Sequence, residues 1–389
     1  MRLDEFQAAL REQRLDGWLF FDHHQRDPLA YRVLELKPAI IPTRRWFYLI
    51  PVEGEPRKLV HRIESSILDA LPGNKIEYAG WSSMVDGLIR LLGGNRRLAM
   101  QYSPKGAIPY VSLVDAGTVE LVRSLGAEVV SSADLIQLFE ARLDQQKLES
   151  HLEAGRRVDS IRREAFKLAS ERLAAGSALT ERELQQFILE RFATNGLKTD
   201  HRPIVAAGEN SGNPHHAPAE HNSRQIRKGD VLLIDLWAKL DKPGSIYYDI
   251  TWTAYCGEPA PDEVQKVFDV VKEARDRAIQ RVERAFERGE PLQGFEVDDA
   301  ARSFIKQQGY GEYFVHRTGH SIGEEVHGAG ANMDNLETHD ERRVLPWTCF
   351  SIEPGIYLPE FGVRLEVNVF ADGQKARVTG EVQQELLYV

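Results

Sequence analysis

The residues of this sequence that could do chemistry are polar side chains that interrupt apolar segments in its second half. They are Asp235, Asp249, His320, Glu353 and Glu366. An ionised carboxylate inside an apolar strand costs several kcal/mol unless it is paired or bound to a cation. Asp235 and Asp249 fall in neighbouring predicted strands, where they would repel each other unless a metal ion lies between them. The pattern therefore predicts a bound cation.

The side-chain types indicate which cation to expect. Four carboxylates and one imidazole form a hard, oxygen-rich ligand set, which favours Mn²⁺, Co²⁺, Fe²⁺ or Zn²⁺ in paired sites over a single structural zinc ion. Four carboxylates also match the charge of two divalent ions. Two such ions about 3.5–4 Å apart can share a bridging hydroxide, which is a strong nucleophile at neutral pH. We predict two divalent metal ions, with Mn²⁺ as the first choice.

Each of these residues also has an ordinary structural explanation. The two aspartates could be a strand-end residue and a capping residue. A glutamate before proline, as at Glu353-Pro354, usually ends a strand, and a histidine in a Gly-rich loop is usually a solvated turn residue. Taken singly they indicate little, but all five together, in this order, favour the metal site.

Two further residues lie close to the five in sequence. Arg364 and Glu366 are two apart on a predicted strand, so both side chains face the same side. An arginine there could hold the last carboxylate in position and offset its charge. His327 follows His320 by seven residues, which places it near the metals without making it a ligand.

The elements that must position these residues are strands and loops between long helices. Helix and strand pairs occur twice in the same order, which predicts a duplicated α/β layer with the strands as a central sheet. The predicted elements are helices at 144–175 and 180–192, a strand at 203–207, strands at 230–237 and 246–256, helices at 262–288 and 296–308, a Gly- and His-rich loop at 316–330, and strands at 348–353 and 362–371.

The first 145 residues predict a separate α/β domain. At 389 residues the chain exceeds the usual size of a single core, and we place the boundary at 145/146, where a long charged helix begins. The first domain shows no Gly-rich phosphate loop, acid pair or histidine cluster. We expect it to shape a cleft or to form an oligomer contact.

Composition excludes several classes of protein. A net charge of −10 and the lack of a Lys/Arg run argue against nucleic-acid binding. Cys256 and Cys349 are far apart in sequence, which indicates a reducing compartment without a disulfide framework. No signal peptide or membrane span is evident. We expect a cytoplasmic protein that binds neither nucleic acid nor membranes.

The candidate residues lie in short motifs of a known family. The motifs are IDLWA with Asp235, DITWT with Asp249, GHSIGEEVH with His320 and His327, SIEPGIY with Glu353, and GVRLE with Arg364 and Glu366. With them, residues 150–389 resemble the pita-bread metallopeptidases, the family of methionine aminopeptidase, aminopeptidase P and prolidase. The first domain resembles that of the proline-specific members and creatinase. The resemblance implies an α+β fold, with a creatinase-like α/β domain at 1–145 and a pita-bread catalytic domain at 146–389.

The resemblance also implies a role for each metal ligand. Asp235 would bind one metal ion and His320 the other, while Asp249 and Glu366 would bridge them. Glu353 would bind the second metal and act as proton shuttle for the attacking hydroxide.

The resemblance further implies substrate-binding and catalytic residues outside the ligand set. Arg364 would support catalysis, and His215 and His327 would steady the substrate carbonyl and the tetrahedral oxyanion. His216 and His221 compete with His215 for the place of the family's proline-site histidine.

Two departures concern specificity. The tyrosine that prolidases carry shortly after the first aspartate is missing, so a substitute must come from Tyr247, Tyr248 or elsewhere. Arg342 and Arg343 lie near, but not at, the place where prolidases hold an arginine for the free carboxylate of a dipeptide.

We therefore predict a cytoplasmic, homodimeric, dinuclear metallopeptidase that hydrolyses the Xaa-Pro bond, first of all in dipeptides. One alternative is an aminopeptidase P that removes the N-terminal residue from longer peptides. The others are a non-catalytic peptide-binding relative on the same fold and a metal hydrolase of another bond, such as a phosphoester.

Overall fold

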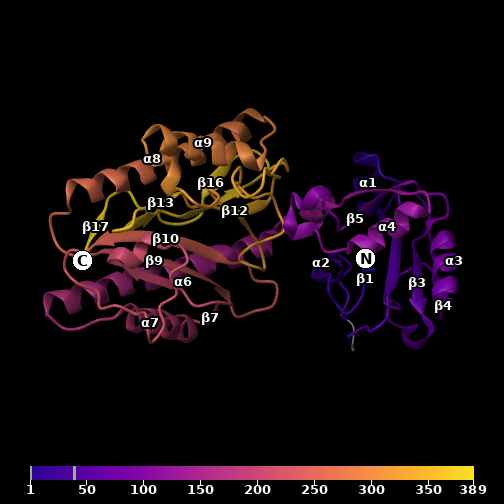
Figure 1. Ribbon diagram of the computed structural model, residues 1–389, viewed down its shortest axis with the longest axis horizontal. Helices are drawn as coiled ribbons and strands as arrows, with labels where there is room; N and C mark the ends of the chain where they lie inside the picture. Colours follow the sequence, from indigo (N-terminus) through magenta and orange to yellow (C-terminus); the bar gives the residue numbers. More distant parts are fainter. Residues whose placement is uncertain (1, 38–40) are drawn as a thin grey trace. The chain divides into compact units, whose positions relative to one another are not determined.

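The computed structural model of this protein describes residues 2–37 and 41–389. The chain forms two compact units, Met1–Glu140 and Ala141–Val389, and Figure 1 follows it from indigo to yellow. The division falls shortly before the predicted boundary at 145/146. None of the described helices has both the length and the apolar character needed to cross a bilayer.

The first unit is a six-stranded mixed sheet with the strand order β4-β3-β2-β1-β5-β6. Strand β1 pairs antiparallel with β2 and parallel with β5. Helix α4 (Ala116–Ser124) begins after Asp115, whose carboxylate accepts the backbone N–H of Thr118. The elements are α1 (Leu3–Glu12), β1 (Gly17–Asp22), α2 (Pro28–Val33), β2 (Trp46–Pro51), β3 (Arg57–His61), β4 (Asn74–Tyr78), α3 (Trp81–Leu92), β5 (Arg97–Met100), α4 (Ala116–Ser124), β6 (Glu128–Ser131) and α5 (Ala133–Ile136).

The second unit is the α+β layered structure that the sequence predicts. In Figure 1, α8 and α9 cover one side of its strands, and α6 and α7 cover the other. Its elements are α6 (Gln145–Ala174), α7 (Glu181–Thr194), β7 (Leu197–Lys198), β8 (Ile204–Ala207), β9 (Val231–Leu240), β10 (Tyr248–Tyr255), α8 (Asp262–Arg288), α9 (Gly294–Gln307), β11 (Ser321–Ile322), β12 (Thr348–Ile352), β13 (Gly355–Tyr357), β14 (Gly362–Arg364), β15 (Val367–Ala371), β16 (Ala376–Val378) and β17 (Leu387–Tyr388).

Local sequence signals set the ends of its helices. A capping box opens α7, since Thr180 Oγ1 accepts the N–H of Glu183 and Glu183 Oε2 accepts the N–H of Thr180. Helix α8 ends at Gly289, whose φ of 64° is the left-handed conformation that glycine adopts at low cost.

Two apolar cores flank the strands. Val158 and Ile188 of α6 and α7 lie in one core with Ile234 of β9. Val271 of α8 lies in the other with Phe350 of β12. The cores hold the strands between two helix pairs.

The last predicted strand, 362–371, is broken where it carries Glu366. Strand β14 pairs with β13, whereas β15 joins the sheet β11-β12-β15-β16. Between them, the N–H of Leu365 donates to Pro354 O and the N–H of Glu366 donates to Thr251 O in β10. The break turns the backbone of Glu366 toward the β9–β10 hairpin.

Candidate metal centre

Two aspartates share one face of the β9–β10 hairpin. Asp235 lies opposite Thr251, and Asp249 lies two residues before Thr251 on β10. Because side chains alternate along a strand and cross-strand partners share a face, all three side chains project to the same side. Asp235, Asp249 and Thr251 are buried. The hairpin thus presents two carboxylates and a hydroxyl group together.

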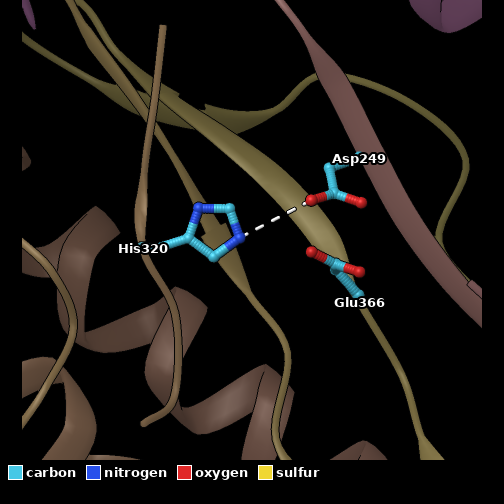
Figure 2. Close-up of side chains that lie close together, drawn as sticks. All are labelled: Asp249, His320 and Glu366. Atoms are coloured by element: carbon cyan, nitrogen blue, oxygen red, sulfur yellow. Dashed lines mark ion pairs between the residues drawn. The ribbon is translucent and has the colours of Figure 1, made fainter. Parts of the chain in front are cut away.

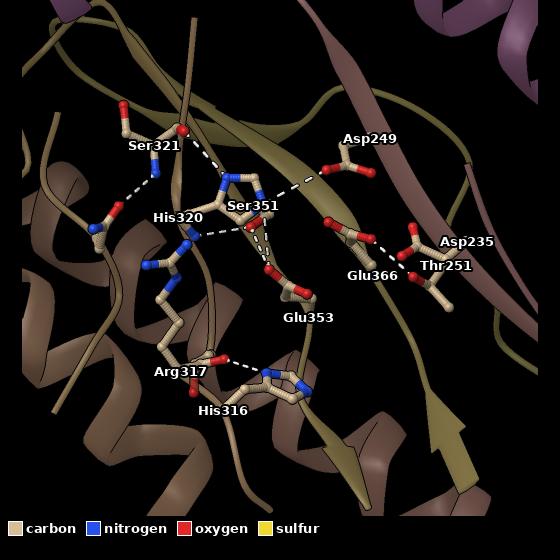
Figure 3. A network of polar contacts seen from close by, with 12 residues as sticks. Asp235, Asp249, Thr251, His316, Arg317, His320, Ser321, Ser351, Glu353 and Glu366 are labelled. Carbon is tan, nitrogen blue, oxygen red and sulfur yellow. Dashed lines mark hydrogen bonds and ion pairs between the residues drawn. The ribbon is translucent and has the colours of Figure 1, made fainter. Parts of the chain in front are cut away.

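Glu366 is fixed to this face by Thr251. The Thr251 hydroxyl donates to Glu366 Oε2 over 2.9 Å, and Thr251 O accepts the N–H of Glu366 over 3.0 Å (Figure 3). The threonine therefore holds both the side chain and the main chain of the glutamate. It lies in the DITWT motif, but the sequence predicts no role for it.

Asn368 of β15 fixes Asp249 in a similar way. Its Oδ1 accepts the N–H of Asp249 over 3.0 Å, and its Nδ2 donates to Asp249 O. Both backbone groups of the aspartate are bound by one side chain. Asn368 thereby ties the position of Asp249 to the strand that follows Glu366.

His320 faces the carboxylates with Nε2. Its Nδ1 lies 3.1 Å from Ser321 O, and because a carbonyl only accepts, Nδ1 carries the proton. Burial lowers the pKa of His320, so the neutral ring turns an Nε2 lone pair toward Asp249 Oδ2 at 3.5 Å and Glu353 Oε1 at 3.4 Å. This is the tautomer in which a histidine binds a metal through Nε2.

Glu353 follows directly after β12. Its Oε1 accepts a hydrogen bond from Ser351 Oγ over 3.1 Å, and the same hydroxyl accepts the N–H of His320 over 2.9 Å. Ser351 therefore couples the positions of His320 and Glu353 (Figure 3).

The carboxylates converge without enough partners. Ligand atoms of Asp249, His320 and Glu366 lie within 4.8 Å of one another, and Figure 2 shows the imidazole pointing toward the two carboxylates. One buried oxygen of Asp235, of Asp249 and of Glu366 has no hydrogen-bond partner in the described part of the chain. Burial raises the pKa of Asp235 to about 6 and that of Asp249 to about 7, and it raises the pKa of Glu366 well above its usual range.

A bound cation would compensate this arrangement of carboxylates. Buried polar atoms are nearly always satisfied in folded proteins, and an uncompensated group of carboxylates is strongly unfavourable. The donor set of four carboxylates and one neutral imidazole is suited to divalent metal ions. The residues present therefore fit such ions.

Arg364 pairs with a different carboxylate from the one predicted. Its Nη2 donates to Asp235 Oδ2 over 2.6 Å, and it reaches Glu366 through Thr251, whose hydroxyl accepts from Nε over 3.0 Å. The prediction that Arg364 holds Glu366 directly assumed one continuous strand, and the break after β14 separates them. The arginine offsets the charge of Asp235.

His316 and Tyr357 extend this chain of contacts, and the sequence predicts no role for either. Tyr357 Oη accepts from Arg364 Nη1 over 3.0 Å and donates to His316 Nε2 over 2.6 Å, since His316 Nδ1–H is directed to Arg317 O. Burial lowers the pKa of His316 to about 3. The sequence contained a signal for both residues, because His316 lies in the Gly- and His-rich loop 316–330 and Tyr357 lies in the SIEPGIY motif.

Tyr357 is the tyrosine that reaches the site. Tyr248 instead donates to Asp159 Oδ2 over 3.0 Å, and Tyr247 packs its ring against Lys239 Nζ at 4.8 Å. That Tyr357 takes the place of the missing prolidase tyrosine stays a prediction.

The predicted second-sphere histidines separate into different environments. The ring of His327 lies edge-on to that of His320 with 4.4 Å between centroids. Repulsion from His320 when both rings are protonated, followed by burial, lowers the pKa of His327 to about 2. His215 is exposed. His216 is buried with Nε2 3.1 Å from Glu181 Oε2, whereas His221 is exposed. Of the three loop histidines, His215 directly follows Pro214, whose carbonyl accepts from Arg364 Nη1 over 3.1 Å.

Arg342 is a structural residue and not a substrate anchor. It is only 5 % exposed, and its Nε and Nη2 donate to the two oxygens of Asp340 over 2.9 and 2.6 Å. Nη1 donates to Ala329 O over 3.0 Å. The guanidinium group therefore makes its hydrogen bonds to groups inside the fold. Arg343 is exposed, and its role in binding a substrate carboxylate stays a prediction.

Residues 149–372 match the family model described as metallopeptidase family M24. An Xaa-Pro dipeptidase from Pyrococcus furiosus is 30 % identical over 243 residues, which cover 62 % of this chain and 64 % of that protein. The match therefore spans less than two thirds of that relative's length. A probable dipeptidase PepE from Mycobacterium bovis is 28 % identical over 349 residues, 88 % of this chain and 84 % of the relative.

The fold is also found in solved structures. A dipeptidase from Pyrococcus horikoshii superposes with a TM-score of 0.67 at 28 % identity, with both chains covered completely. The likeness extends over both units, including the first 140 residues that the family model does not match.

Proposed function

The chain belongs to metallopeptidase family M24, and we propose that it hydrolyses the Xaa-Pro bond of small peptides, with dipeptides as its main substrates. The observation that carries this proposal is the cluster of Asp249, Glu366 and His320, whose ligand atoms lie within 4.8 Å of one another, while each of the two carboxylates keeps one buried oxygen without a hydrogen-bond partner. The similarity to an Xaa-Pro dipeptidase and to a dipeptidase structure supports the substrate class.

Asp235, Asp249, His320, Glu353 and Glu366 would hold two divalent metal ions, with Mn²⁺ as the first candidate. When bound, such ions supply Lewis-acid polarisation of a carbonyl and an activated water at neutral pH. The neutral His320 and the four carboxylates supply the donor atoms, and Arg364 keeps the excess negative charge at Asp235 in check.

Glu353 is the carboxylate best placed to move protons. Its side chain is 16 % exposed, compared with 11 % for Asp235 and 7 % for Asp249. A group that takes a proton from water and delivers it to the leaving amine must be reachable from the substrate side. Ser351 Oγ holds Glu353 Oε1 while Oε2 remains for that exchange.

His327 and His215 would bind the substrate carbonyl and the developing oxyanion. A pKa of about 2 keeps His327 neutral at physiological pH, so it can donate one N–H without adding a charge. A preoriented donor of this kind contributes most where negative charge develops in the transition state.

Aminopeptidase P activity on longer peptides is the second candidate, and one observation favours it. Arg342 is committed to Asp340, so one of the two candidate anchors for the free carboxylate of a dipeptide is absent. Arg343 is the other candidate for this anchor. The homodimer and the cytoplasmic location also stay predictions.

The test is an assay of Xaa-Pro, Xaa-Pro-Yaa and longer peptides, with and without Mn²⁺, together with metal analysis of the purified protein. The proposal expects about two metal equivalents per chain, metal-dependent turnover and the highest kcat/KM for dipeptides. Rates that rise with peptide length would favour aminopeptidase P. Bound metal with peptide binding but no cleavage would indicate a non-catalytic relative, and cleavage of phosphoesters alone would overturn the peptidase assignment.

A further inference from the structure

The first unit contains a hollow of 650 Å³ that the proposed peptidase function does not use. It lies where β1, β3 and β4 end and where β2 and α3 begin, and His23, Arg45, His61, Tyr78 and Trp81 are among its lining residues. Ligands of α/β proteins commonly bind at the carboxyl ends of strands. A volume of this size suits a small organic molecule.

The lining is cationic in a chain that is acidic overall. Arg26, Arg44 and Arg45 all line the hollow, with Asp115 as the acidic residue among the lining side chains, and the chain carries a net charge of −10. The sequence showed no cluster here, because these arginines and the two histidines come from separate segments.

The arginines are only weakly compensated. Within residues 2–37 and 41–389, neither Arg44 nor Arg45 has a carboxylate within ion-pair distance of its guanidinium group, and Arg26 Nη2 lies 3.8 Å from Asp115 Oδ2. Glu64 lies nearby, but its oxygens accept from Thr43 N, Thr43 Oγ1 and Arg44 N. Arg44 Nη1 donates to Thr43 O and Oγ1, and Arg26 Nε donates to His23 O, which leaves the other guanidinium N–H groups for an anion.

Two other features of the hollow favour a ligand that is an anion or carries an aromatic ring. Helix α3 begins at Trp81 beside the hollow, and its N-cap residue Gly80 offers no side-chain cap. The first N–H groups of a helix favour anions. Trp81 is 60 % exposed, and the guanidinium carbon of Arg45 lies over its ring at 5.4 Å from the centre, so a flat apolar ring and a positive charge lie together.

We propose that this hollow binds a small organic phosphate that carries a flat aromatic group, of the size of a nucleoside diphosphate. The phosphates lie against Arg44, Arg45 and Arg26, whose planar forks pair with phosphate oxygens. The ring lies on Trp81. A bare phosphate leaves most of the 650 Å³ unfilled, and an uncharged ring leaves the arginines uncompensated.

The test is isothermal titration of the full-length protein with ADP, pyrophosphate, citrate and adenosine. The proposal expects ADP to bind more tightly than pyrophosphate, pyrophosphate more tightly than citrate, and adenosine not at all. The variant Arg44→Gln/Arg45→Gln should weaken ADP binding by about tenfold or more, and Trp81→Ala should remove the advantage of ADP over pyrophosphate.

Arg90→Gln is the matched control, because Arg90 is an exposed arginine at the other end of α3 and does not line the hollow. It should leave ADP affinity unchanged. Should the double variant melt at a lower temperature, Arg26→Gln on another loop provides the same test. No ADP binding at millimolar concentration, unchanged binding in both arginine variants, or equal weakening by Arg90→Gln would overturn the proposal. Peptide cleavage is measured separately, so failure here leaves the proposed peptidase function standing.

Discussion

Two sets of buried carboxylates in the second unit differ in how their oxygens are satisfied. At the metal centre, Asp235, Asp249 and Glu366 each keep one buried oxygen without a partner in the described chain. Asp340 is buried as deeply, yet its Oδ1 accepts from Arg342 Nε and its Oδ2 accepts from Arg342 Nη2.

The difference distinguishes carboxylates that converge on one site from a carboxylate that is paired with an arginine. A buried carboxylate with a full set of donors needs no ligand and supports the fold as long as its partner is intact. A buried carboxylate with an orphaned oxygen is unfavourable in the isolated protein and persists where a ligand completes it. Variants of the first set should therefore lose function while the fold is retained, and variants of the second set should do the reverse.

The largest expected effect is that of Glu353→Gln. The amide is a poor ligand and cannot accept a proton, so kcat on an Xaa-Pro dipeptide should fall by about 10⁴, the upper end for loss of a general acid–base group. The melting temperature of the metal-free protein should stay close to that of the wild type, because the change is isosteric. Steady-state kinetics and a thermal melt check both parts. Near-normal turnover of the metal-loaded variant would contradict the role of Glu353.

Arg342→Ala should lower the stability of the fold instead of the catalytic rate. Removal of one partner from a buried ion pair costs about 3–5 kcal/mol, which here leaves the Asp340 carboxylate buried without its counter-charge, with the backbone N–H groups of Asn332 and of residue 342 as its donors. Urea unfolding measures this cost, and metal content should not change.

The neighbouring Arg343→Ala is the matched control, because Arg343 is exposed. Its cost should stay within about 0.5 kcal/mol. If Arg343 binds the substrate carboxylate, KM should rise by about tenfold or more for Xaa-Pro dipeptides and remain unchanged for their amides. A stable Arg342→Ala variant with weakened dipeptide binding would mean that Arg342 belongs to the functional set.

Asn368→Leu tests a residue that is not a carboxylate of either set. The side-chain amide of Asn368 is hydrogen-bonded to both backbone groups of Asp249 and so holds this carboxylate in position. Groups that orient a metal ligand commonly contribute 10- to 100-fold to metal affinity. We expect a loss in that range, measured by competition with a chelator. Metal affinity equal to that of the wild type would show that β10 holds Asp249 without this side chain.

The smallest expected effect concerns His151, a buried residue whose two ring nitrogens both have hydrogen-bond partners. Its Nδ1–H donates to Tyr247 O over 2.6 Å, and its Nε2 lies 2.7 Å from Thr379 Oγ1. Burial lowers the pKa of His151 from 6.5 to about 4. The unfolded chain therefore binds more protons between these values, and the stability present above pH 6.5 is lost as the pH falls toward 4.

For one group with these pKa values, the loss between pH 7 and pH 5 is about 2 kcal/mol. Urea unfolding at both pH values, for wild type and His151→Gln, isolates this part as the difference between the two proteins. An identical decline in both would show that His151 is protonated in the folded state.

The sequence by itself determined those properties that depend on residues close together in the chain. A carboxylate in an apolar segment carries its energetic cost wherever the strand lies, so Asp235 and Asp249 could be singled out from their neighbours alone. The capping box at Thr180 and the apolar period of α8 likewise depend on residues a few positions apart, and both elements form as predicted.

What only the tertiary structure decided was which partner each polar group finds. Arg364 pairs with Asp235 across 129 positions of sequence and not with Glu366 two residues away. Tyr357 reaches the site while Tyr248 is bound by Asp159, and Arg342 is taken up by Asp340 inside the fold. The local sequence determines which side chains need a partner. The partner is set by strand pairing, by the break at Glu366 and by packing, and these depend on contacts between segments that are distant in the chain.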